Sequence, residues 1–181
     1  MKFDLKYGAG IKTVQIPEEV DIKLLQPETM PVLKSLPFAL GDALENPLGC
    51  DALSKQLKQK EQSRIALAIP DATLATPVKK LVSIVLEHIY QSLPDLKPGV
   101  ITIVIGSGLH TPPDIEKQND LIPYDIVHGC NIVVHDANKF MAKDFGTTSR
   151  GTPVRINAAF AEADFKIVIG QIDPHQFVGF T

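Results

Sequence analysis

Four short runs of apolar residues, separated by longer segments, constrain the fold of this chain more than any other feature. They cover residues 64–69, 100–105, 131–134 and 165–169. Within these runs apolar and β-branched side chains mostly follow one another instead of alternating with polar ones. Strands of this kind are buried on both faces, as in a parallel sheet covered by helices. The runs therefore predict an α/β fold, with a Rossmann-like, mostly parallel sheet flanked by helices.

The segments between the runs supply the other expected elements. The clearest helix is predicted over residues 77–93, where Pro77 lies in the first turn and apolar residues recur at helical spacing. Further helices are predicted over 41–60, 113–121 and 154–163. Residues 2–16 alternate around Gly8 and Gly10, which predicts a short amino-terminal β-hairpin. We expect residues 1–181 to form a single α/β domain, and because no helix follows the last run, to be the amino-terminal part of a longer two-domain protein.

Composition excludes several classes of protein. The net charge of -3 and the lack of a basic cluster argue against a nucleic-acid partner. Cys50 and Cys130 lie far apart without metal-knuckle spacing, as expected of reduced thiols. The amino terminus lacks the apolar core of a signal peptide, and no apolar run approaches the roughly 20 residues that cross a membrane. We therefore expect a cytoplasmic protein without membrane contact.

Polar residues follow each predicted strand at its carboxyl end. Asp71 and Thr73 follow the first strand, His110 follows the second after a Gly106–Gly108 turn, and His175 follows the fourth. Because parallel strands present their carboxyl ends at one edge, we expect these residues to meet where ligands bind. Two histidines that face one pocket can exchange protons at neutral pH on both sides of a carbon. This arrangement suits racemisation or epimerisation.

Simpler interpretations exist for these residues. Asp71 and Thr73 could cap the following helix, and His135 with Asp136 could be an ordinary loop pair after the third strand. The Gly106-Ser107-Gly108 segment could begin a nucleotide-binding loop, although Thr111 occupies the position of the third glycine. The spacing of the histidines matches no standard metal pattern, so no metal site is predicted within this chain.

The same residues carry a resemblance to a known family. The chain resembles the amino-terminal domain of the nickel-dependent lactate racemase family, which uses a nickel-pincer nucleotide. The landmarks occur in the family's order along nearly the whole chain. They are Tyr7-Gly8-Ala9-Gly10, Asn46-Pro47-Leu48-Gly49, Asp71-Ala72-Thr73, Gly108-Leu109-His110-Thr111-Pro112, His135-Asp136 and the segment from Ala163 to Phe180.

The resemblance implies a reaction and roles for individual residues. In this family the cofactor is thought to accept a hydride from the carbon bearing the hydroxyl of a 2-hydroxy acid, and to return it to either face. By this likeness His110 and His175 are the acid/base pair. Asp71, Thr73, Gly108 and Gly179 would contact substrate or cofactor. The resemblance also implies a carboxy-terminal domain of the same protein as partner.

Departures from the family pattern modify this expectation. Leu74 stands where the family has an arginine, and leucine cannot clamp a carboxylate as a guanidinium does. We therefore expect a 2-hydroxy acid other than lactate, or a non-catalytic ligand-binding module with the same fold. The family's cofactor-anchoring lysine and a nickel-ligand histidine have no counterpart in these residues. The chain alone is therefore expected to be inactive.

Overall fold

A computed structural model describes residues 1–8, 10–23, 30–59, 64–125, 127–139, 141–175 and 179–180. The chain falls into two compact units, Met1–Lys34 and Ser35–Thr181. Each unit is described by itself. Ala9 of the opening glycine motif and Lys60, the predicted end of the helix over 41–60, lie outside the described residues.

The first unit contains the predicted hairpin. Strands β1 (Lys2–Tyr7) and β2 (Gly10–Gln15) pair antiparallel, with Phe3 opposite Val14. The backbone of Ile16 closes the open end by donating to the Met1 carbonyl over 2.9 Å. Gly8 has φ +58°, a left-handed conformation that glycine adopts without steric cost. The prediction of an amino-terminal β-hairpin is therefore confirmed.

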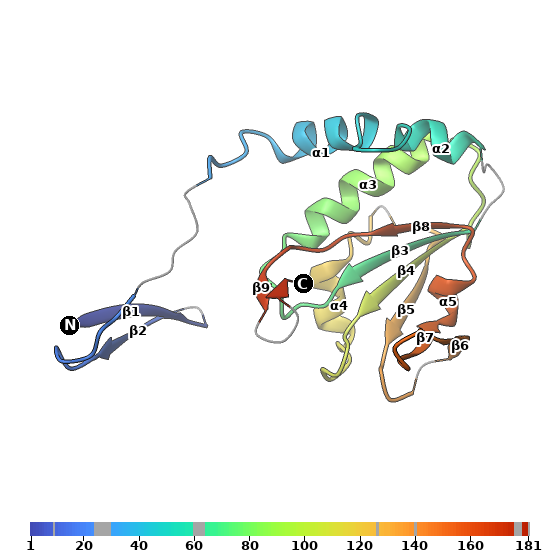
Figure 1. The fold of residues 1–181 in the computed structure, drawn as a ribbon. Coiled ribbons are helices and arrows are strands. Elements are labelled where there is room, and N and C mark those ends of the chain that lie inside the picture. Colours follow the sequence, from blue (N-terminus) through green and yellow to red (C-terminus); the bar gives the residue numbers. More distant parts are fainter. Residues whose placement is uncertain are drawn as a thin grey trace. The chain divides into compact units, whose positions relative to one another are not determined.

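The second unit is built on a four-stranded parallel sheet (Figure 1). Its strands are β3 (Ile65–Pro70), β4 (Ile101–Gly106), β5 (Asn131–His135) and β8 (Phe165–Val168), in the order β5-β4-β3-β8. The chain moves outward from β3 to β5 and then crosses to the other side of β3. This reversal of strand order defines a topological switch point, the usual ligand-binding position of open α/β sheets. The predicted fold class is confirmed.

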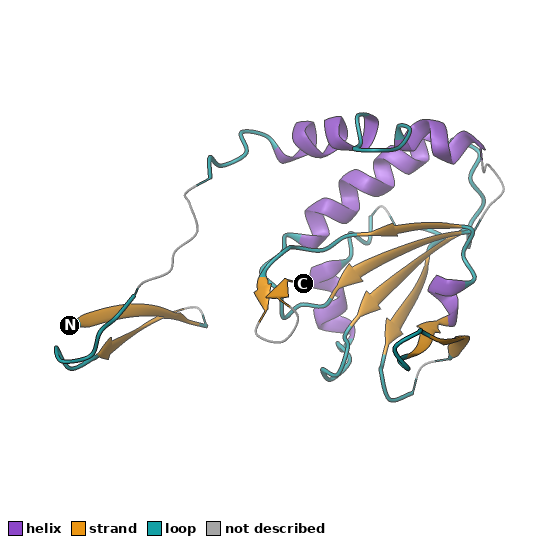
Figure 2. Ribbon diagram, viewed as in Figure 1, coloured by secondary structure: helices purple, strands orange, loops and turns teal. Residues whose placement is uncertain are grey.

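Helices complete the core of this unit (Figure 2). Helix α3 (Val78–Ser92) buries Val82, Leu86 and Ile89 completely, as its apolar stripe predicted. These side chains join alternate residues of β3 and β4 in one apolar cluster. Helix α4 (Ile115–Leu121) matches the predicted element and is capped by Asp114. None of the helices in the described residues is long and apolar enough to cross a membrane.

The helix predicted within residues 41–60 is present as α2 (Leu53–Gln59), and the same segment also contains the end of α1 (Leu36–Glu45). A turn at Leu48 and Gly49 separates the two helices. Helix α1 ends before Pro47, because the residue that precedes a proline is kept out of helical geometry, and Gly49 has φ +74° in the turn that follows.

The predicted helix over 154–163 is mostly wrong. Residues Pro153–Asn157 form strand β7, which pairs with β6 (Ala142–Thr147), and only Ala158–Ala161 are helical as α5. Strand pairing with a neighbouring segment outweighs the helical spacing of the apolar residues here. Two more strands that the sequence did not predict, β9 (Pro174–His175) and β10 (Gly179–Phe180), pair antiparallel near the end of the chain.

Candidate active site

The carboxyl edge of the sheet carries a row of polar residues. In register, Pro70 of β3 pairs with Gly106 of β4, and Gly106 pairs with His135 of β5. The residues that directly follow these partners are Asp71, Ser107 and Asp136. The expectation that the polar loops share one edge is met, because all four strands run in the same direction (Figure 1).

Asp71 and His110 form a hydrogen-bonded pair at this edge. Oδ2 of Asp71 lies 2.8 Å from Nδ1 of the His110 imidazole. The other carboxylate oxygen, Oδ1, accepts hydrogen bonds from the Thr73 backbone amide at 3.0 Å and from the Thr73 hydroxyl at 2.5 Å. The hydroxyl oxygen of Thr73 also lies 3.4 Å from Nδ1 of His110. The structure therefore brings together Asp71, Thr73 and His110, three of the residues that the sequence singled out.

The two members of the pair differ sharply in exposure. The Asp71 side chain is 7 % exposed, whereas the His110 side chain is 61 % exposed. Burial raises the pKa of Asp71, but hydrogen bonds from Thr73 and His110 outweigh burial and leave the pKa below its ordinary value. Asp71 is therefore ionised at neutral pH and can only accept hydrogen bonds. It follows that Nδ1 of His110 carries a proton and that Nε2 is left with a lone pair in the neutral ring.

A tight turn presents His110 to solvent. The His110 amide donates to the carbonyl of Ser107 over 2.9 Å, and Gly108 inside the turn has φ +56°. This backbone conformation favours glycine, and a side chain at Gly108 would point into open space. Gly108 therefore has a clear structural role in the turn, while its predicted contact with substrate or cofactor stays a prediction.

His175 lies in β9, on the segment that leaves β8. A hydrogen bond between the Thr76 hydroxyl and the Gln171 side chain joins this segment to the loop that follows β3. The predicted binding residue Gly179 pairs directly with His175 in the β9–β10 ladder and has φ +83°. The two predicted residues near the end of the chain are thus neighbours. The convergence of His110 and His175 on one cleft stays a prediction.

His135 is engaged differently from His110. Its Nδ1 lies 3.2 Å from Nδ2 of Asn157, and Oδ1 of Asn157 accepts from the Ala159 amide at the start of α5. Asp136 accepts from the Asn138 amide within its own turn. These bonds favour the structural interpretation of the His135–Asp136 pair. Within the described ranges, no three side chains of His, Cys, Asp or Glu are grouped to hold a metal ion.

The glycine-rich segment at 106–108 does not lead directly into a helix. It is followed by the His110 turn, and α4 begins only at Ile115. The amino terminus of α4 is already capped by the Asp114 carboxylate, which accepts from the Lys117 amide over 2.9 Å. A carboxylate in this position occupies the place that a phosphate would take. The geometry therefore gives no support to a nucleotide-binding loop here.

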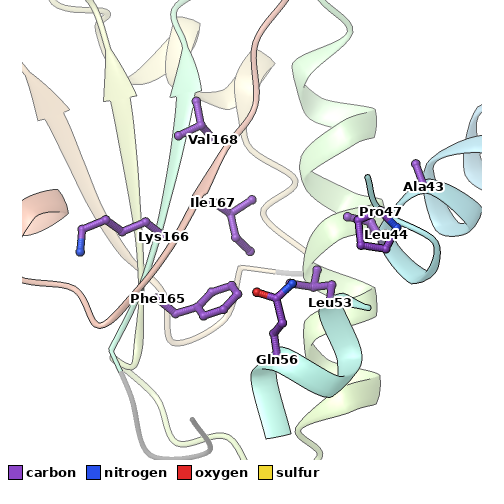
Figure 3. A pocket seen from close by; sticks show the side chains of 9 residues that line it. All are labelled: Ala43, Leu44, Pro47, Leu53, Gln56, Phe165, Lys166, Ile167 and Val168. Carbon is purple, nitrogen blue, oxygen red and sulfur yellow. The ribbon is translucent and has the colours of Figure 1, made fainter. Parts of the chain in front are cut away.

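A separate apolar pocket lies along β8, away from the His110 turn (Figure 3). Phe165 and Ile167 point toward Leu53 of α2, whereas Lys166 points away from it. The remaining lining comes from Ala43, Leu44, Pro47, Gln56 and Val168. No acid/base group faces another in this pocket, so it does not offer proton-transfer chemistry.

The fold and this site define a class of protein. An open α/β sheet with a topological switch point, and with a buried aspartate bonded to an exposed histidine at its carboxyl edge, has the architecture of α/β domains that bind ligands at that edge. Comparison with known protein families identifies the family. The lactate racemase N-terminal domain family matches residues 7–181, and the chain belongs to this family.

Individual relatives agree with this assignment. The chain is 31 % identical over 141 residues to a lactate racemase of Lactiplantibacillus plantarum and 29 % identical over 140 residues to one of Thermoanaerobacterium thermosaccharolyticum. Each alignment covers 77 % of this chain and 32 % of the relative, so the aligned part is about a third of either relative's length.

A solved structure of the apoprotein of lactate racemase from Thermoanaerobacterium thermosaccharolyticum has the same fold. It superimposes with a TM-score of 0.76 at 24 % sequence identity, and the match covers 100 % of this chain and 41 % of that chain.

Proposed function

We propose that this chain supplies the acid/base residues of an enzyme that racemises or epimerises a 2-hydroxy acid. The observation that supports the proposal best is the 2.8 Å bond between the buried Asp71 carboxylate and Nδ1 of the exposed His110 ring. Membership of the lactate racemase N-terminal domain family supports the reaction type. The names of the two relatives support a 2-hydroxy acid as substrate.

His110 acts as the base in this proposal. With Nδ1 donating to Asp71, the lone pair of Nε2 is available to take the hydroxyl proton of the substrate. The ring then becomes a cation, and the ionised Asp71 next to it stabilises that charge. Asp71 also fixes the ring orientation, so it is a positioning residue for His110. Thr73 completes the arrangement by holding the other oxygen of the Asp71 carboxylate.

His175 is proposed as the second acid/base group. Return of the hydride to the opposite face of the planar keto acid requires the carbonyl oxygen to take a second position, and one histidine would reach the oxygen in only one of the two positions. The bond between Thr76 and Gln171 supports this role, because it ties the segment that carries His175 to the loop that carries Asp71. Gly179, paired with His175, would leave room for the ligand.

The nickel-pincer nucleotide is proposed as the cofactor of the complete enzyme on the basis of the family. When bound, it would supply the redox half of the reaction by taking and returning a hydride. The described residues contain no group of three metal-binding side chains, so they do not fit a nickel site by themselves. The proposed roles of His110, His175, Asp71 and Thr73 are therefore limited to proton transfer and positioning. We infer that residues 1–181 alone do not turn over substrate.

Substrate choice is proposed to differ from that of enzymes with an arginine after the Asp-x-Thr sequence. Leu74 is 43 % exposed in the loop that follows β3, three residues after Asp71. It presents an apolar side chain where a carboxylate clamp would need a cation. We therefore propose that the substrate is a 2-hydroxy acid other than lactate. We also propose that a carboxy-terminal domain of the same protein helps to bind it and that the enzyme works in the cytoplasm.

The test uses the longer protein that contains this chain. Chiral chromatography of 2-hydroxy acids, lactate included, should show interconversion, and either His110→Ala or His175→Ala should reduce the rate by about 100-fold or more. His128→Ala is the matched control, because His128 lies in an exposed turn. Full rates in both variants would remove the proposed acid/base pair. Binding of 2-hydroxy acids without interconversion would favour a non-catalytic module.

A further inference from the structure

The hydroxyl of Ser107 is buried without a hydrogen-bond partner among the described residues. Ser107 is 1 % exposed and directly follows β4, at the start of the turn that carries His110. A buried hydroxyl without a partner is destabilising compared with an apolar group of similar size, and such groups are rare in native proteins. This cost points to a second arrangement of the site in which the hydroxyl is bonded.

The position of Ser107 indicates a candidate acceptor, Asp71. The paired residues Pro70 and Gly106 end the ladder between β3 and β4, so Asp71 and Ser107 are the next residues on adjacent strands. Alternate residues of both strands, ending with Ile69 and Ile105, belong to the apolar cluster that α3 covers. Side chains alternate along a strand, so Asp71 and Ser107 continue on the same face.

The Asp71 carboxylate has room for one more donor. An ionised carboxylate offers about four acceptor positions. Three are occupied in this structure, two by Thr73 on Oδ1 and one by His110 on Oδ2. The donor on Oδ2 is 61 % exposed, and it is carried by a turn in which Leu109 is 84 % exposed. If His110 swings toward a ligand, Oδ2 is left as a buried, unpaired oxygen.

We propose that Ser107 is a positioning residue whose hydroxyl donates to Oδ2 of Asp71 when His110 moves away. When the Ser107 hydroxyl takes the place of His110 as donor, the buried Asp71 carboxylate stays hydrogen-bonded and ionised. His110 can then leave and return without the free-energy cost of an unpaired buried oxygen. A catalytic benefit of this exchange of donors rests on the proposed function. The hydrogen bond between Ser107 and Asp71 does not rest on it. The test therefore measures stability and geometry, not turnover.

A double-mutant cycle on residues 1–181 tests the exchange. With His110 present, Ser107→Ala should leave the melting temperature unchanged or raise it, because it removes an unbonded hydroxyl. In the His110→Ala background, where the hydroxyl should bond to Asp71, the same change should lower the melting temperature by about 2–4 °C. A destabilisation that occurs only in the His110→Ala background is not expected of a residue with a merely structural role.

Ser83→Ala is the matched control, because the Ser83 hydroxyl donates to the Lys79 carbonyl within α3. It should have the same effect in both backgrounds. An effect of Ser107→Ala that is equal in both backgrounds overturns the proposal. So does a destabilisation with His110 present, since the hydroxyl would then already have a partner.

A crystal structure of the His110→Ala variant gives a second test that needs no double variant. The expected distance between Oγ of Ser107 and Oδ2 of Asp71 is below about 3.2 Å, within hydrogen-bond range. A distance above about 3.5 Å, with Oδ2 unpaired or bonded to water, overturns the proposal.

Discussion

At the scale of single residues, the site consists of a buried Asp71 carboxylate that is hydrogen-bonded to the exposed His110 imidazole. Asp71 is held in place by Thr73 and His110, and both of these partners are exposed to solvent whereas the carboxylate is not. Both residues could be predicted as strand-end positions, but Asp71 was expected to contact substrate or cofactor. Their pairing depends on the register between β3 and the loop after β4, which local sequence does not encode. The burial of the Ser107 hydroxyl could not be predicted for the same reason.

Replacing the Asp71 carboxylate by an amide tests whether His110 needs a negatively charged partner or only a hydrogen-bond partner that orients its ring. For the proposed two-domain enzyme, we expect Asp71→Asn to reduce the racemisation rate by about 100-fold or more, because the amide no longer stabilises a charged His110 ring. The rate is measured by chiral chromatography at saturating substrate. Asp125→Asn is the control, since Asp125 lies in an exposed turn and should leave the rate unchanged. An unchanged rate in Asp71→Asn would show that His110 needs no charged partner.

Asp71 should also make stability depend on pH in the acid range. Its pKa is lowered in the folded chain, because the hydrogen bonds outweigh burial, while in the unfolded chain it is about 3.9. The carboxylate therefore contributes stability that is fully present above about pH 4 and is lost as pH falls through the lower folded pKa. Urea unfolding of residues 1–181 should show a difference in stability between wild type and Asp71→Asn that shrinks as the pH falls below about 4. A difference that does not change with pH would contradict this assignment.

At the scale of elements, strands were easier to predict than the segments around them. The four sheet strands are continuous apolar runs, and burial on both faces requires that pattern, so local sequence was sufficient. Strand β7 has no such run, because it is partly exposed and pairs only with β6. Its few apolar residues fit helical spacing equally well, and only the partner strand decides between the two. Similarly, the break between α1 and α2 depends on a turn at Gly49 that interrupts an otherwise helical pattern.

Three helices of the second unit are joined by one polar group. Glu45 at the end of α1 accepts from the Ser54 hydroxyl of α2 at 2.7 Å and lies 2.6 Å from Nε2 of His88 in α3. The hydrogen bond from Ser54 contributes most to lowering the pKa of Glu45. We expect Glu45→Ala to lower the melting temperature of residues 1–181, because α1 and α2 each lose a polar link to a neighbouring helix.

The contribution of Glu45 should disappear in acid. Since its pKa is lowered on folding, the stability that it provides is present above its unfolded pKa and is lost as pH falls through the folded value. Glu87→Ala is the matched control, because Glu87 lies on the exposed side of α3. Equal melting temperatures for the two variants at pH 7 would show that the link between the helices does not stabilise the fold.

At the scale of the whole molecule, the two compact units differ in what holds them together. The second unit has a continuous apolar cluster that runs through α3 and the central strands. The first unit has a two-stranded hairpin in which Leu5, Tyr7 and Ile11 are exposed. An isolated two-stranded hairpin is only marginally stable in water. Nearly all of the folding free energy of this chain should therefore come from residues 35–181.

Deletion of residues 1–34 tests this division. Every residue of the apolar cluster, and both members of the Asp71–His110 pair, lie in the second unit. We expect residues 35–181 to unfold cooperatively, with a melting temperature within about 2 °C of that of residues 1–181, since the shortened chain keeps every member of the described apolar cluster. Thermal unfolding followed by circular dichroism at 222 nm, the usual helix signal, measures the effect.

A variant with Leu86→Ala in both lengths is the control, because Leu86 is fully buried and its truncation should cost about 2–5 kcal/mol in either chain. Loss of the cooperative transition in the shortened chain would mean that the hairpin is a necessary part of the fold, as expected of a single undivided domain.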